Sequence, residues 1–129
     1  MSRESIPDDV KRFVLTSIPS IPYLETLLLL RSNENRLWSS ADVARRIYIS
    51  EKAALGLLQE LLSSGFASTA DTDGTQYRYA PVNQDMRAMI DRLAQSYSKN
   101  LVDVTELVHS KINKRAKQFA DAFIWRKDS

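Results

Sequence analysis

Residues 37–80 read LWSSADVARRIYISEKAALGLLQELLSSGFASTADTDGTQYRYA, and this stretch decides the fold. Ser39 or Ser40 can cap a helix, because a serine side chain accepts a hydrogen bond from a free N–H group of the first turn. Ser50 can cap a second helix, and Gly65 follows the last turn of that helix as a stop signal. The apolar positions that we expect on the buried faces are Ala41, Val43, Ala44 and Ile47 in the first helix and Ala54, Leu57, Leu58, Leu61 and Leu62 in the second. The pattern predicts two short helices joined by a tight turn.

A β-hairpin is predicted directly after these helices. Phe66–Ala70 and Tyr77–Tyr79 are short runs rich in aromatic or β-branched residues, and Asp71–Gly74 between them supplies an Asp-Gly turn. With a short strand at Leu37, the element order is strand, helix, turn, helix, strand, turn, strand. This order predicts a winged helix-turn-helix, a mainly α-helical fold class with one small β-hairpin.

The same stretch resembles the winged helix-turn-helix regulators of bacteria, in the manner of the MarR, ArsR and PadR groups. The resemblance rests on residues 37–44, 50–58 and 61–66, and it covers roughly residues 20–82. The flanks, residues 18–22 and 119–123, are similar to those of small, uncharacterised bacterial winged-helix proteins. The resemblance implies a winged-helix fold and, as a function, the regulation of transcription.

Composition limits the other classes of protein. The chain has 129 residues with 43% hydrophobic content, which suits one compact domain with an appendage. It contains no cysteine, so disulfide frameworks, thiolate metal sites and zinc fingers are excluded, and a reducing cytoplasm is the simplest setting. The N-terminus lacks an apolar signal region, and the run Leu27–Leu30 is far too short to span a bilayer. We expect a soluble, cytoplasmic protein.

The winged-helix domain is expected to occupy residues 1–82 and to begin with two further helices. Pro7–Asp9 can open a short helix whose apolar side chains face one way. Pro22 then starts a helix over Tyr23–Arg31, which is apolar on most sides, as expected of a helix packed beneath its neighbours.

Residues 83–129 are expected to form a C-terminal helical extension. Apolar residues recur at steps of three or four from Asn83 onward, at Met86, Ile90, Leu93, Tyr97, Leu101, Val104, Val108, Ile112, Phe119 and Phe123, with Ala116 filling the gap. Residues 83–127 form either one long helix or two, with a break at residues 98–100 where Asn100 can cap the second. So long a stripe either folds back across the domain or pairs with a second copy. We expect a homodimer through residues 86–123.

Charge is distributed unevenly along the chain. Residues 37–82 hold four cations and five acidic residues, a net charge of −1, whereas residues 111–127 hold six cations and one acid, a net charge of +5. Lys and Arg normally supply the phosphate contacts of DNA-binding proteins. The basic tail could therefore touch DNA or RNA, with Trp125 available for stacking, or it could be an ordinary solvated helix face.

Candidate DNA contacts lie on the second helix and on both sides of it. The face opposite the leucine stripe carries Lys52, Gly56, Gln59 and Ser63. Lys52 could reach a phosphate or guanine, Gln59 could read adenine, and Gly56 would allow a duplex to approach closely. Candidate contacts to the DNA backbone are Arg45, Arg46 and Arg78. The alternative is a solvated face, with Arg45 and Arg46 complementing the helix C-terminus.

Enzyme chemistry and metal binding find no support in the sequence. His109 is the sole histidine, and it is better explained as a surface partner of Glu106 than as half of a catalytic dyad. Residues 71–74 look superficially like a calcium loop, but the alignment puts Thr69 at the first ligand and Ala80 at the twelfth, where a carboxylate is needed. We expect no enzyme, no metal and no cofactor.

Two functions from different classes remain. The first is a dimeric, DNA-binding transcription regulator whose two recognition helices stand roughly 34 Å apart, so that they meet successive major grooves. The second is a winged-helix module for protein–protein interaction that does not bind DNA. Its support is the acidic wing tip, where Asp71 and Asp73 would repel phosphates, together with exposed Leu55 and Gly56.

Overall fold

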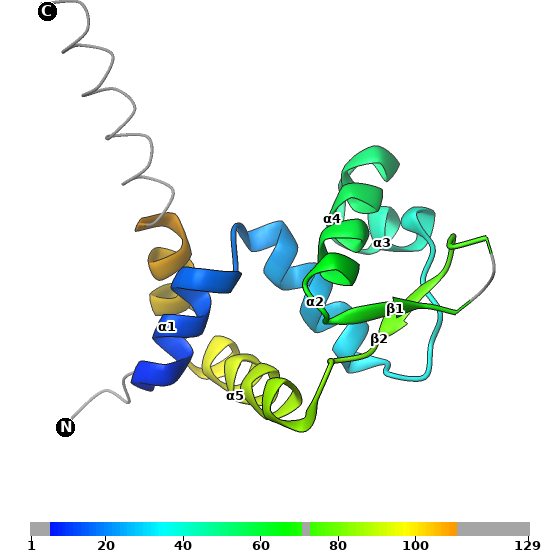
Figure 1. The fold of residues 1–129 in the computed structure, drawn as a ribbon. Coiled ribbons are helices and arrows are strands. Elements are labelled where there is room, and N and C mark those ends of the chain that lie inside the picture. Colours follow the sequence, from blue (N-terminus) through cyan, green and yellow to red (C-terminus); the bar gives the residue numbers. More distant parts are fainter. Residues whose placement is uncertain (1–5, 71–72, 111–129) are drawn as a thin grey trace, which may run out of the picture. The chain divides into compact units, whose positions relative to one another are not determined.

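The computed structural model describes residues 6–70 and 73–110 (Figure 1). The chain divides into two compact units. One unit is Pro22–Ala94, and the other consists, among the described residues, of 6–21 together with 95–110. The first unit holds the segment that decides the fold.

The unit of residues 22–94 is a winged helix. Its helices and hairpin follow the predicted order: α2 (Ile21–Ser32), α3 (Ser40–Ile47), α4 (Glu51–Ser63), β1 (Ala67–Thr69), β2 (Tyr77–Tyr79) and the first turns of α5 (Gln84–Lys99). β1 pairs antiparallel with β2 (Figure 1). In this pairing Ser68 lies opposite Arg78. α3 packs against α4, and α4 packs against β1. The predicted fold class, mainly helical with one small hairpin, is confirmed.

Local signals set the ends of α3 and α4 as the sequence predicted. The Ser39 hydroxyl accepts a hydrogen bond from the Asp42 N–H, and the Ser50 hydroxyl accepts one from the Ala53 N–H. α4 ends in a Schellman motif, in which Phe66 N–H donates to Leu61 C=O at 3.0 Å and Gly65 lies in the left-handed region at φ 81°. The bond from Phe66 also explains why β1 starts one residue later than predicted.

The prediction of a short strand at Leu37 is wrong, because no strand forms there. Only Trp38 pairs, through two hydrogen bonds of 2.7 and 2.8 Å with Tyr77, and this pairing is an isolated bridge. The turn at residues 33–35 and the cap at Ser39 leave too little extended chain between them for a longer ladder.

The core-facing stripe of α4 is narrower than predicted. Ala54, Leu58 and Leu61 are buried, but Leu57 is only half-buried and Leu62 is 39% exposed. At about 100° per residue, Leu57 and Leu62 fall on the two flanks of the buried stripe, where they keep contact with solvent. α2 is apolar on most sides, as predicted, and its buried side chains are Tyr23, Leu24, Thr26, Leu27 and Leu30.

The second unit combines α1 (Asp8–Ser17) with residues 95–110. α1 buries Val10, Phe13 and Val14, the face predicted for it. α5 ends at Lys99, Asn100 is not helical, and residues 101–110 are helical again, so of the two alternatives the broken helix is found. The Asn100 carbonyl accepts the Val104 N–H at 3.0 Å as the new helix begins.

The break changes which side chains of the predicted C-terminal stripe are buried. Val104 and Val108 are buried, but Leu101 is 53% exposed, contrary to its predicted place in the stripe. The non-helical residue at Asn100 interrupts the helical period, so the predicted stripe does not continue unbroken through Leu101. The stripe positions Ile112, Ala116, Phe119 and Phe123 lie outside the described residues.

Within residues 6–70 and 73–110, no single helix is both long and apolar enough to cross a membrane. α1 and α2 reach that length and composition only when they are counted together across the break between them.

Candidate nucleic-acid interface

The outer face of α4 lies opposite its buried stripe. Lys52, Gln59 and Ser63 are exposed on this face, as the sequence predicted, and Gly56 between them is half-buried. A Cβ built on Gly56 would meet no atom within 4 Å. Among the described residues, neither Lys52 nor Gln59 has a side-chain hydrogen bond or ion pair. These side chains are free to contact a molecule outside the fold.

Charge on the outer face of α4 is mixed. Glu51 and Glu60 are also exposed on α4, which has Lys52 as its one lysine, so the helix itself is not basic. Leu55 is exposed by 39% on one flank, which it shares with Leu62. Positive charge that could attract phosphate must therefore come from neighbouring elements.

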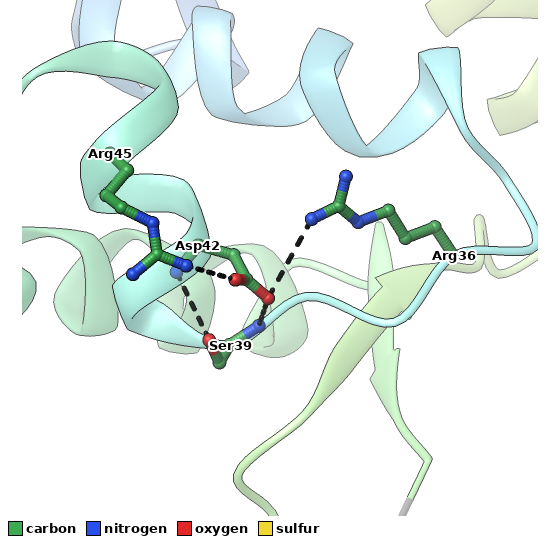
Figure 2. Close-up of polar contacts among 4 residues, drawn as sticks. All are labelled: Arg36, Ser39, Asp42 and Arg45. Carbon is green, nitrogen blue, oxygen red and sulfur yellow. Dashed lines mark hydrogen bonds and ion pairs between the residues drawn. The ribbon is translucent and has the colours of Figure 1, made fainter.

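Asp42 in the first turn of α3 gathers two arginines (Figure 2). Its carboxylate accepts the Ser39 N–H at 3.1 Å and the Arg45 guanidinium at 2.8 Å, and the Arg36 guanidinium lies 4.0 Å away. The hydrogen bond from the Ser39 backbone, helped by both arginines, holds the pKa of Asp42 below its usual value. The carboxylate therefore stays ionised and pairs with Arg36 and Arg45.

Trp38 supports Arg36 and Arg46 through its ring. The Arg36 guanidinium carbon lies 3.9 Å from the ring centroid, and that of Arg46 lies 5.7 Å away. Cations at such distances are attracted to the face of an indole. Trp38 itself is fully buried. We call Arg36, Arg45 and Arg46 the arginine cluster. Arg36 and Arg45 pair with Asp42, and Arg36 and Arg46 lie over Trp38, so three guanidinium groups and one carboxylate make the cluster net positive.

Arg36 is the member of this cluster that the sequence reasoning missed. Arg36 precedes residues 37–82, whose charges indicated the candidate contacts. Its spacing from Trp38 carried a signal, because residues two apart on an extended segment project to the same side. Arg45 and Arg46 lie in the last turn of α3, as predicted, but Arg45 turns back to Asp42.

The wing adds one exposed cation. Arg78 projects outward between the buried Tyr77 and Tyr79, and its Nε donates to the Ser68 hydroxyl at 3.4 Å. Asp73 is exposed in the connection between the strands, and Asp71 lies outside the described residues. Burial raises the pKa of Tyr79 to about 12, so this side chain stays neutral and serves packing.

The turn between α3 and α4 holds a tyrosine in a rare conformation. Tyr48 has φ 60° and ψ 49°, in the left-handed region, and its N–H caps α3 by donating to Ala44 C=O. Its side chain is 92% exposed. Sequence reasoning did not single it out, because no pattern of residue types shows which residue of a turn is left-handed.

The residues considered for metal binding and catalysis lie outside α4. Residues 6–70 and 73–110 contain no group of three His, Cys, Asp or Glu side chains that could hold a metal. His109 and Glu106 are both exposed on the helix of residues 101–110. The unit of α1 contains a hollow of about 360 Å³, lined by Ile6, Lys11, Asp103, Glu106, Leu107 and Ser110.

Comparison with known proteins gives similarity in structure only. No family model matches the chain, and a search of curated proteins finds no relative. Among solved structures, the chain is similar to the adhesin competence repressor (AdcR) of Streptococcus pyogenes, with 14% identity, a TM-score of 0.48 and 95% of each chain covered. It is also similar to a MarR-family protein of Mycobacterium tuberculosis in complex with salicylic acid, with 15% identity, a TM-score of 0.41 and 98% of each chain covered.

Proposed function

We propose that this protein is a DNA-binding transcription regulator of winged-helix type that works as a homodimer. The observation that carries the proposal is the outer face of α4, which presents Lys52, Gln59 and Ser63 away from the core. α4 is the second helix of a helix-turn-helix, the element that such proteins place in the major groove. A regulator of this kind acts beside the chromosome, which in a bacterium is in the cytoplasm.

Each contact has a proposed role. Lys52 binds a phosphate or a guanine edge, Gln59 pairs with adenine, and Ser63 donates a hydrogen bond near the far end of α4. Gly56 has no side chain, so the backbone of α4 can approach the duplex closely. Base contacts from so few side chains need phosphate contacts to hold the protein in register.

The arginine cluster supplies those phosphate contacts, together with Arg78 in the wing. Arg36, Arg45 and Arg46 lie at the two ends of α3, the first helix of the motif, which in such proteins crosses the DNA backbone. Asp42 and Trp38 hold Arg45 and Arg36 in place, so these side chains lose less freedom on binding than unrestrained arginines.

The dimer is proposed to form through residues 86–123. Leu101 and Val102 are adjacent and exposed by 53% and 59%, which leaves apolar surface for a second copy to cover. Two copies can place their α4 helices on successive major grooves when the helices are roughly 34 Å apart on one face.

A second candidate function, binding of a partner protein, is supported by the apolar and acidic side chains exposed on α4. Leu55 and Leu62 are each 39% exposed on one flank of α4, and the two glutamates of that helix outnumber its one lysine. This surface suits a partner protein better than it suits phosphates. On this alternative the fold is an interaction module that does not bind DNA.

Fluorescence anisotropy of a labelled random duplex tests the proposal when it is measured at several salt concentrations. Each phosphate contact contributes a slope of about −0.9 to log K against log salt, so about four contacts give a slope near −4. We expect micromolar binding with a slope near −4 or steeper.

Variants make this test specific for the helix-turn-helix. The double variant Lys52→Ala and Gln59→Ala should bind about tenfold or more weakly, since it loses a charged and a polar contact. The control is Lys11→Ala, which removes an exposed lysine from the other unit and should bind as the wild type does. Absence of binding at low salt would contradict the proposal and favour the interaction module.

A further inference from the structure

Tyr48 occupies a backbone position that does not suit it. At φ 60° it is the one residue other than glycine with a positive φ among the described residues. In this region Cβ crowds the following carbonyl, so glycine, and next asparagine, are the residues that such a position favours. A tyrosine at this position therefore does not stabilise the turn between α3 and α4.

Packing does not account for the tyrosine either. Its side chain is 92% exposed, more than any other large apolar side chain in the described chain. Within residues 6–70 and 73–110 the Tyr48 hydroxyl has no hydrogen-bond partner; the hydrogen bond from Tyr48 to the Ala44 carbonyl comes from the backbone N–H. Strain in a bulky residue that makes no contact inside the fold points to a use outside it.

The position of Tyr48 suggests what that use is. Tyr48 follows Arg45 and Arg46 at the end of α3 and precedes Ser50, the N-cap of α4, and Lys52 in its first turn. Along the chain, Tyr48 therefore lies between residues whose side chains are proposed to contact DNA. Tyrosine hydroxyls are among the groups that bind phosphate oxygens in protein–DNA complexes.

We propose that Tyr48 is a DNA-contact residue whose hydroxyl donates a hydrogen bond to a phosphate oxygen of duplex DNA at the turn between α3 and α4. The proposal rests on the function proposed above and adds a residue to that surface. A phenol is uncharged, so its contact displaces no counterion. It should raise affinity without changing the dependence of affinity on salt, which distinguishes it from the arginines.

Three variants of the full chain separate this contact from a structural role. Tyr48→Phe removes only the hydroxyl, Tyr48→Asn removes the ring and suits the left-handed backbone, and Arg45→Ala removes a charge. Leu15→Asn is the matched control, since it replaces a 41%-exposed apolar side chain outside the helix-turn-helix. Each is measured by thermal unfolding and by anisotropy with the random duplex at several salt concentrations.

We expect Tyr48→Phe to bind about tenfold more weakly, the effect of one hydrogen bond to a charged group, with an unchanged salt slope. Tyr48→Asn should bind at least as weakly, although its Tm is equal to or above that of the wild type. Arg45→Ala should flatten the slope by about 0.9. Leu15→Asn should bind as the wild type does.

Two results would overturn the inference and leave the proposed function in place. One is wild-type affinity for duplex in both Tyr48 variants. The other is a lower Tm for Tyr48→Asn than for the wild type, which would mean that the tyrosine side chain supports the fold. Failure of the wild type to bind duplex even at low salt would instead remove the proposed function, and the role of Tyr48 with it.

Discussion

At the scale of single residues, Asp42 links the fold to the candidate site. The same carboxylate completes the capping box of α3 with Ser39 and holds two guanidinium groups of the arginine cluster (Figure 2). The sequence predicted the serine cap because that signal is local. It did not predict the position of Arg36, which depends on Trp38 and on the bridge from Trp38 to Tyr77 in the distant wing.

The role of Asp42 predicts a pH-dependent contribution to stability. The pKa of Asp42 is lower in the folded chain, so its contribution is fully present above the unfolded-state pKa of about 3.9 and is lost as pH falls through the folded value. Urea unfolding of the wild type and Asp42→Asn should therefore show the largest difference in the free energy of unfolding at neutral pH. That difference should shrink below about pH 4. A difference that stays constant from pH 7 to pH 3 would contradict this role.

At the scale of elements, signals within a few residues predicted most of the winged helix. The caps at Ser39 and Ser50 and the stop at Gly65 are found where they were expected. The exposure of Leu62 and Leu101 was not predicted, because the width of a buried stripe depends on the neighbours that pack against the helix. Exposure of the outer face of α4 could be predicted, because it follows from the pattern within one helix. The contact between Arg36 and the Trp38 ring could not be predicted, because it depends on tertiary packing.

Gly56 in α4 permits a test in which stability and binding move in opposite directions. Gly56→Ala should raise the free energy of unfolding by about 0.5–1 kcal/mol, because alanine favours a helix and its Cβ meets open space. It should also weaken duplex binding, since the added methyl stands between the backbone of α4 and DNA. Urea unfolding and anisotropy measure the two effects.

Gly74→Ala is the comparison for Gly56→Ala. Its Cβ also meets open space, but its φ of 66° makes alanine unfavourable, so this variant should lose stability. A Gly56→Ala protein that is more stable and binds duplex as tightly as the wild type would show that the α4 backbone does not approach DNA closely.

At the scale of the whole molecule, the distribution of charge raises the question of which part of the chain would bind DNA. Residues 37–82 have a net charge of −1, whereas residues 111–127 have a net charge of +5. The arginine cluster includes Arg36, which this count leaves out, and it concentrates cations at α3 even though the surrounding sequence is not basic. A duplex could be held by the helix-turn-helix or by the basic tail alone, and only the first agrees with a recognition role for α4.

Backbone amide chemical shifts of the ¹⁵N-labelled full chain, recorded while an unlabelled duplex of about 20 base pairs is added at low salt, test this role most directly. The proposal predicts shifts along α4 (Glu51–Ser63), at Tyr48 and the arginine cluster, and at Arg78 in the wing. The amides of α1 (Asp8–Ser17) should change little. Shifts confined to residues 111–127, or no shifts at all, would contradict the claim that α4 meets DNA.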